Sequence, residues 1–354
     1  MPKPKLVIVH GMGQHTAASF QGEVLEGLSF AFNLYEHLAG KSPQDYVELV
    51  SVEYNSIFDA ARERMKKQAL PVKERLGGIE GMDAAAVQQA LSALVGFQAR
   101  LGDDGFFNTH WLDVFLYRFT TIGELVRIHI GAAITQTLAS VHGGTLNGHV
   151  LAHSLGTSVV HDTLAKLYGS GPDNLNVDSQ QMGSLHLVAN TSRVLASFIA
   201  VDKSLTRPGV HGCCEYFREY RHQLDPITWP LPFNPHKGDG WIAADAYDAD
   251  EYQLIKLHDV TNAQGNTHDI RHYLANPDVH QQLFERVLGI KLTVEQRTEG
   301  RQKYQTHTLA EVAENLKLAF NDLNNLDIDS LEGLIEAARQ AKVFVEGLGG
   351  QYDL

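Results

Sequence analysis

Residues 148–167 read GHVLAHSLGTSVVHDTLAKL, and this stretch decides the fold. The run from His149 to Ala152 is short and mostly apolar, as in a strand that is buried on both faces. A helical pattern follows directly, and its inward face is predicted to contain Val160, Leu164 and Leu167. A buried strand that turns at once into an amphipathic helix is typical of an α/β protein with a parallel sheet.

The turn between this strand and this helix reads Ala152-His153-Ser154-Leu155-Gly156. In a tight turn of this kind, the nucleophile elbow, the central serine is strained, so the residues two positions before and after it must be small. Ala152 and Gly156 are small, although Ala152 replaces the commoner first glycine. The helix also points its positive amino end at the serine. Ser154 is therefore a candidate nucleophile; the alternative is a serine that caps an ordinary helix.

A second signal lies near the start of the chain, where the apolar run Lys5–Val9 ends in His10-Gly11. After an early strand, such a turn would bring the backbone N–H of Met12 close to the nucleophile. There it can pair with the N–H of Leu155 as an oxyanion hole, which stabilises the negative charge of a tetrahedral intermediate.

Two phosphate-binding interpretations of the glycine-containing turns fit poorly. A dinucleotide loop that starts at Gly11-Met12-Gly13 would need its third glycine where Thr16 stands, and only a generic Glu53 could bind the ribose. A P-loop that ends at Gly40-Lys41-Ser42 would need its leading glycine where Tyr35 stands. Neither class of nucleotide site is predicted.

The rest of the chain alternates strand and helix patterns. After Thr16 a helix is predicted as far as Gly40, with apolar residues at Phe20, Val24, Leu28, Ala31 and Tyr35. Further strand-like runs are Tyr46–Tyr54, Leu185–Val188, Val194–Val201, Cys214–Tyr220 and Tyr252–Leu257. This alternation predicts the α/β class, with a mostly parallel sheet and helices on both of its faces.

The strand–Ser154–helix unit and the amino-terminal V-I-V-H-G turn together resemble the α/β-hydrolase superfamily, specifically its lipase and esterase-like members. The resemblance covers residues 5–54 and about 111–277. It implies the α/β-hydrolase fold and a catalytic triad in the chain order serine, acid, histidine, with the acid after a late strand and the histidine after the last one.

The acid and the base are sought in the loops that the resemblance indicates. Asp225 lies in Leu224-Asp225-Pro226, beyond a strand end, which resembles the acid loop of lipase-like hydrolases; Asp202, at the end of the preceding strand-like run, is the alternative acid. His268 stands five residues ahead of a Tyr-Leu-x-x-Pro run, which resembles the histidine loop of the same group. His272 is the alternative base.

A metal site at the same loop is a further alternative. His268, Asp269 and His272 include a histidine pair at i, i+4, but the Glu of H-E-x-x-H is absent and no third ligand is evident. No metal is predicted. His10, Gly11 and His153 flank the expected site, and they are predicted to shape its turns and line the substrate pocket.

Excess length is concentrated in two helical regions. Residues 62–100 are predicted to form a helical insert before the nucleophile strand, either a lid over the pocket or an ordinary packed helix pair. The segment Trp111–Leu138 has the pattern of the crossover helix, with Ile122, Leu125, Val126, Ile130 and Ile134 at helical spacing. The predicted domains are a catalytic domain over 1–290 and a helical extension over 291–354.

Composition limits the classes of partner. The 354 residues include 29 Lys and Arg against 42 Asp and Glu, a formal net charge of −13, which disfavours nucleic acid and anionic lipid surfaces. The start of the chain shows no signal peptide, and the most apolar window, Phe119–Leu138, contains charged residues, so no membrane anchor is predicted. With its two cysteines adjacent at Cys213 and Cys214, the chain is expected to be cytoplasmic.

The predicted reaction is the cleavage of a carboxylic ester, small or lipid-like, through an acyl-enzyme on Ser154, with His268 as base, Asp225 as acid and no cofactor. Two alternatives stay open. A thioester or a peptide bond could be cleaved by the same triad, because the triad does not choose the leaving group. The chain could also be a noncatalytic interaction protein on this fold.

Overall fold

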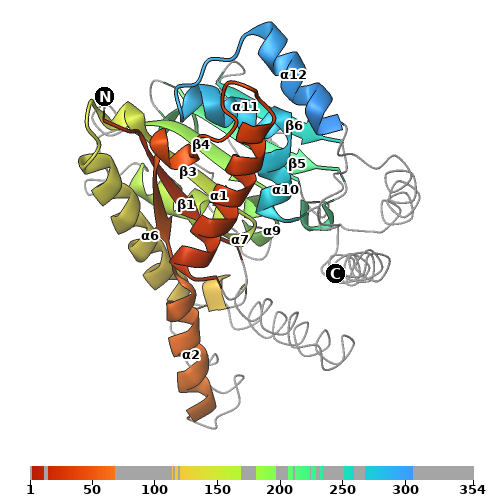
Figure 1. Ribbon diagram of the computed structural model, residues 1–354. Helices are drawn as coiled ribbons and strands as arrows, with labels where there is room; N and C mark the ends of the chain where they lie inside the picture. Colours follow the sequence, from red (N-terminus) through yellow and green to blue (C-terminus); the bar gives the residue numbers. More distant parts are fainter. Residues whose placement is uncertain are drawn as a thin grey trace.

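The computed structural model describes residues 2–11, 15–67, 114, 116–118, 120–168, 181–196, 206–209, 212–223, 225–228, 232–233, 251–258 and 268–305. Its centre is a six-stranded sheet in which every neighbouring pair of strands is parallel. The strands are β1 (Lys5–Val9), β2 (Glu48–Val52), β3 (Gly148–His153), β4 (Met182–Val188), β5 (Cys214–His222) and β6 (Tyr252–Leu257). Their order across the sheet is β2-β1-β3-β4-β5-β6 (Figure 1).

The first face of the sheet is covered by α1 (Ala17–Asn33), α10 (Ile270–Ala275) and α11 (Pro277–Arg286). Figure 1 shows α1 and α10 side by side in front of the strands. The apolar face predicted for α1 is buried in full, although the helix ends at Asn33 rather than near Gly40. A further helix, α12 (Val294–Gln305), packs its Tyr304 into the same cluster.

The second face is covered by α6 (Ile122–Ala139) and α7 (Leu155–Leu167), with α2 (Asn55–Lys67) and α9 (Ser192–Ala196) at its border. Side chains of α6 and α7 share one apolar cluster with the strands; they include Val126, Ile130, Ile134, Val160 and Leu164. Three short 3-10 helices, Pro43–Asp45, Thr145–Asn147 and Pro226–Thr228, complete the described elements.

The strand order places a switch point between β1 and β3. From β1 the chain moves outward to β2, and it then returns to the other side of β1 and continues in the opposite direction as β3 to β6. Ligands of open α/β sheets bind beyond the carboxyl ends of the strands at such a point, because the neighbouring loops diverge there. The carboxyl ends of β1 and β3 carry Gly11 and Ser154.

One sequence prediction about an element is wrong. Residues 194–196 of the predicted strand Val194–Val201 lie in helix α9, where the side chain of Asn190 accepts the N–H of Ser192 and so starts a helical turn. The helix predicted within Trp111–Leu138 is confirmed from Ile122 onward as α6, in which Val126 is buried and Leu125 is 54% exposed. The remainder of Val194–Val201 lies outside the described residues.

Several other predictions concern residues that the structure does not describe. These are most of the helical insert over 62–100, the extension beyond residue 305, the alternative acid Asp202 and the oxyanion-hole residue Met12. In the described part of the chain, no helix has both the length and the apolar character needed to span a membrane.

Candidate active site

Ser154 occupies the turn between β3 and α7 in a strained conformation. Its backbone angles are φ 55° and ψ −129°, a region that residues other than glycine rarely adopt. The N–H of Ser154 donates to the carbonyl of Val188, while its own carbonyl accepts from the N–H and the side chain of Thr157 and from the hydroxyl of Thr191. These bonds hold the strained turn in place, and the serine hydroxyl is left free of any capping role.

Two glycines near Ser154 allow the β1 turn to approach the start of α7 closely. A Cβ atom at Gly156 would collide with the carbonyl oxygen of His10 and would lie 2.7 Å from that of Val9. A Cβ atom at Gly11 would lie 2.5 Å from the Cβ of Ser154. The two glycines therefore let the β1 turn lie directly against the nucleophile turn.

His268 links Ser154 to Asp225. Its Nε2 lies 2.9 Å from Ser154 Oγ, and its Nδ1 lies 2.9 Å from Asp225 Oδ2. Because a carboxylate only accepts, Nδ1 carries the proton, and Nε2 is left to accept the hydrogen of the Ser154 hydroxyl. The structure thus brings together the three side chains that the sequence analysis selected, in the chain order serine, acid, histidine.

Local structure explains how the acid and the base are positioned. Asp225 follows β5, and its backbone N–H donates to the carbonyl of His222 at the end of that strand. His268 stands two residues before α10, whose amino end is capped by Asp269 through the N–H of Arg271. Each of the two residues is therefore held next to the end of a regular element.

Asp225 is fully buried and remains ionised because several groups donate to it. Its Oδ2 accepts from His268 Nδ1 and from the Tyr273 hydroxyl at 2.7 Å, and its Oδ1 accepts from the N–H of Ile227. Burial alone would raise the pKa of Asp225, but the charge of His268 and these hydrogen bonds lower it below its usual value.

His268 is one quarter exposed, and its environment stabilises the imidazolium form more than water does around a free histidine. Burial would lower the pKa of His268, but the charge of Asp225 and the hydrogen bond to it raise the pKa above the ordinary histidine value. A base held in this way is well suited to accept a proton from Ser154, because the carboxylate stabilises the positive charge that then develops.

Tyr273 is a member of the site that sequence reasoning did not identify. Its hydroxyl accepts the N–H of His222 and donates to Asp225, so it connects the end of β5 to the acid. The residue lies in the same Tyr-Leu-x-x-Pro run that pointed to His268. The sequence pattern could have indicated a role for Tyr273, because a tyrosine on a buried helical face needs a hydrogen-bond partner for its hydroxyl.

The β1 turn is held by aromatic and polar contacts. The hydroxyl of Tyr54 donates to the carbonyls of His10 and Gly11, and the rings of His10 and Tyr54 stack with centroids 4.2 Å apart. His10 is fully buried, and burial lowers its pKa to about 4, so its neutral ring donates through Nδ1 to the carbonyl of Gly11. His10 thus supports the turn from inside the protein.

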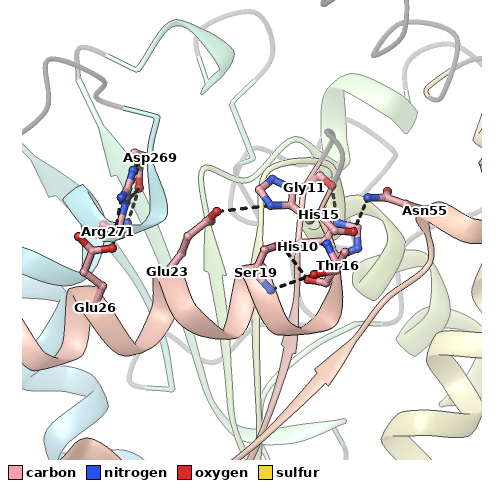
Figure 2. A network of polar contacts seen from close by, with 10 residues as sticks. All are labelled: His10, Gly11, His15, Thr16, Ser19, Glu23, Glu26, Asn55, Asp269 and Arg271. Atoms are coloured by element: carbon pink, nitrogen blue, oxygen red, sulfur yellow. Dashed lines mark hydrogen bonds and ion pairs between the residues drawn. The ribbon is translucent and has the colours of Figure 1, made fainter. Parts of the chain in front are cut away.

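A polar network continues from this turn along α1. Figure 2 shows His15 beside Glu23, 3.6 Å from its carboxylate, while the Asn55 amide donates to the carbonyl of His15. Farther along the helix, Arg271 pairs with both Asp269 and Glu26. This network ties the residues that follow β1 and those that follow His268 to the same helix.

The other predicted site residues have the following positions. His272 packs its ring against His222 and Tyr273, and it is His268 that lies at Ser154 Oγ. Leu155 is the first residue of α7, where a backbone N–H has no partner within its own helix. Across the described residues, no group of three or more histidine, cysteine or acidic side chains is arranged to hold a metal ion.

The arrangement can activate a hydroxyl group for attack on an electrophilic carbon. A serine, a histidine and a buried carboxylate form a continuous chain of hydrogen bonds, and the serine lies at the amino end of a 13-residue helix. Comparisons with protein-family models, with curated proteins and with solved structures found no match for this chain.

Proposed function

We propose that this chain is a serine hydrolase with the α/β-hydrolase fold, and that it cleaves carboxylic esters. The observation that carries the proposal is the hydrogen-bonded chain Ser154–His268–Asp225. Further support comes from the strained turn at Ser154 and from its position at the switch point of a parallel sheet.

The proposed reaction has two steps. His268 Nε2 takes the proton of Ser154 as Oγ attacks the ester carbonyl, and it then gives this proton to the leaving alcohol as the acyl-enzyme forms. In the second step water attacks the acyl-enzyme and gives a proton to His268, which passes it to Ser154 Oγ as the bond between Oγ and the acyl group breaks. The carboxylic acid leaves and the serine hydroxyl is restored. Asp225 fixes the tautomer of His268 and stabilises its charged form throughout.

The negative charge of each tetrahedral intermediate needs donors that are already in position. We assign this role to the backbone N–H groups of Leu155 and Met12. In support, Leu155 begins α7 directly after Ser154, and the β1 turn that leads to Met12 touches Ser154 at Gly11.

Labelling with a fluorophosphonate probe tests the proposal, because such probes react covalently with activated serines. Peptide mass spectrometry should locate the label on Ser154 in the wild-type chain, and Ser154→Ala should abolish both labelling and the hydrolysis of p-nitrophenyl esters. Ser140→Ala is the matched control and should label like the wild type, because Ser140 caps the carboxyl end of α6 and its hydroxyl accepts from Lys5 at the start of β1.

Two outcomes would change the proposal. Absence of label on a folded wild-type chain would favour a noncatalytic interaction protein. Labelling combined with faster turnover of thioesters or anilides than of esters, in a panel with one shared acyl group, would reassign the leaving group while keeping the triad.

A further inference from the structure

His153, the residue before the nucleophile, makes a contact that the proposed reaction does not use. It ends β3 and is 8% exposed, and its Nε2 lies 2.7 Å from the backbone carbonyl oxygen of His268. The two imidazole rings lie tilted at 38°, with centroids 4.7 Å apart. Because a carbonyl oxygen only accepts, Nε2 of His153 carries the proton and donates it.

This hydrogen bond joins two segments that are far apart in the sequence. Ser154 and His268 are separated by 114 positions, and a hydrogen bond joins their side chains. The carbonyl of His268 lies just ahead of Asp269, which caps α10, and it accepts the Nε2–H of His153. His153 is the residue directly before Ser154, so this bond ties the main chain of His268 to the turn that carries Ser154.

The charge state of His153 suits this role. Burial lowers the pKa of His153 to about 3, and the charge of His268 contributes in the same direction. The ring therefore stays neutral when His268 becomes an imidazolium ion. A neutral donor can hold the main chain of the base without placing a second positive charge beside it, which would oppose proton transfer from Ser154.

We propose that His153 is a positioning residue, which fixes the main chain of His268 and keeps the base in register with the nucleophile turn. The separate prediction that His153 lines the substrate pocket stays a prediction. The kinetic part of the inference rests on the proposed function, whereas the structural part concerns His268 alone and can be tested without turnover.

The side chains of glutamine and asparagine separate positioning from simple packing. Glutamine carries its amide nitrogen three bonds from Cβ, as histidine carries Nε2, so His153→Gln can still donate to the carbonyl of His268. His153→Asn is polar as well but one bond too short, and His153→Leu fills the space without a donor. His149→Leu is the control, because it removes another buried histidine of β3 that bonds to Ser184 instead.

The kinetic expectation is graded among these variants. His153→Asn and His153→Leu should lose about 10- to 100-fold in kcat/KM, mostly through kcat, because a misplacement of about 1 Å is enough to reduce turnover by this amount. His153→Gln and His149→Leu should stay within about threefold of the wild type. Two results would show a packing role and overturn the inference. One is an equal loss of kcat/KM in His153→Gln and His153→Asn, and the other is an equal loss in His149→Leu and His153→Leu.

A second measurement does not depend on activity. The measurement is an NMR titration of a Ser154→Ala chain whose histidines are labelled at Cε1. The signal that disappears in His268→Gln belongs to His268, and its pKa should lie above the ordinary value. His153→Asn should move this pKa back toward the ordinary value, and His153→Gln should not. If the wild-type chain takes no fluorophosphonate label, the proposed function fails, but this titration still decides whether His153 positions His268. An unchanged titration in His153→Asn would overturn the inference even in an active enzyme.

Discussion

The hydroxyl of Tyr273 donates a 2.7 Å hydrogen bond to Oδ2 of Asp225, the same oxygen that accepts the Nδ1–H of His268 at 2.9 Å. The tyrosine is fully buried, and its oxygen also accepts the N–H of His222, which fixes the direction of its own proton. The acid thus has a second donor that is independent of the base, and this donor keeps the carboxylate charged and oriented.

Tyr273→Phe should therefore affect both stability and chemistry. It removes one donor from a buried carboxylate and leaves the N–H of His222 without its acceptor, so the free energy of unfolding should fall by about 1.5 to 3 kcal/mol. The pKa of Asp225 should rise toward its usual value, and kcat/KM for a p-nitrophenyl ester should fall about fivefold to tenfold, since a triad member then orients its partner less well.

Urea unfolding and initial-rate kinetics measure these two effects. Tyr220→Phe is the control, because the buried hydroxyl of Tyr220 bonds to His186 in the core. It should lose stability and keep its kcat/KM. Equal kinetic losses in both variants would mean that Tyr273 acts only through packing.

At position 154 a glycine variant should be more stable than an alanine variant, which is the reverse of the usual order. The positive φ angle costs about 1 to 3 kcal/mol for a residue with a side chain, and glycine avoids this cost. Ser154→Gly should therefore be more stable to urea than Ser154→Ala by about 1 kcal/mol, although neither variant should be labelled by fluorophosphonate. Ser140, with φ −96°, should show the ordinary order, with alanine more stable than glycine. The same order at both positions would argue against the strained turn.

Much of the fold could be predicted from local sequence patterns. The parallel strands were visible because buried strands read as short apolar runs, and α1 and α7 because their apolar residues recur at helical spacing. The strand predicted over Val194–Val201 failed for a local reason, since an apolar pattern cannot show that Asn190 and Ser192 start a helix just before it. A local hydrogen bond, rather than the apolar pattern, accompanies the helical start of this run.

The candidate site could be predicted only in part. Ser154, Asp225 and His268 were selected by their places at element ends, and the structure puts their side chains within hydrogen-bonding distance. The supporting contacts made by Tyr273 and His153 could not be predicted. Burial and residue type indicate that a polar side chain needs a partner, but the partner lies 48 positions away for Tyr273 and 115 positions away for His153. Chain folding alone determines such pairs.

The two glycines Gly156 and Gly22 should respond to alanine in opposite directions. At Gly156 the added Cβ meets two carbonyl oxygens of β1 and its turn, which cannot move aside as a flexible side chain could. The free energy of unfolding should fall by about 3 kcal/mol. Gly22 lies on α1 with open space around it, and Gly22→Ala should raise that energy by about 0.5 to 1 kcal/mol. Urea unfolding measures both, and a well-tolerated Gly156→Ala would contradict the close approach of β1 to α7.

The pH profile of kcat/KM should follow the neutral fraction of His268. In the proposed reaction His268 is the base and must be unprotonated, and its pKa lies above the ordinary histidine value of 6.5. The rate should therefore fall as the pH is lowered through this raised pKa, at a pH higher than an unperturbed histidine would give. Asp225→Asn removes the charge that raises the pKa, so the acidic limb should move to lower pH while the maximal rate drops. An acidic limb that stays in place in Asp225→Asn would show that another group controls the profile.

The stability of the fold should fall at mildly acidic pH because several buried histidines are neutral. Burial lowers their pKa values from 6.5 to about 3 or 4, and the residues concerned are His10, His149, His153, His272 and His280. Their contribution to stability is complete above pH 6.5 and is lost as the pH falls toward those values, since the unfolded chain then binds more protons.

His268 has the opposite effect, because its pKa is raised. Its contribution to stability is complete below pH 6.5 and is lost as the pH rises through its folded pKa. The contribution of Asp225 is complete above pH 3.8, and it is lost as the pH falls from there through the lowered pKa of the folded chain.

Between pH 6.5 and 4 the buried histidines therefore dominate. The free energy of unfolding, measured by urea titration at a series of pH values, should be lower at pH 5 than at pH 7.5 by about 3 kcal/mol or more. His280→Asn tests the cause, because this ring lies in the core between Tyr35 and Leu274 and its loss removes one titrating group. The slope of stability against pH should become shallower by up to about 1.4 kcal/mol per pH unit in that variant, whatever its absolute stability. A slope that does not change would mean that His280 already titrates normally in the folded chain.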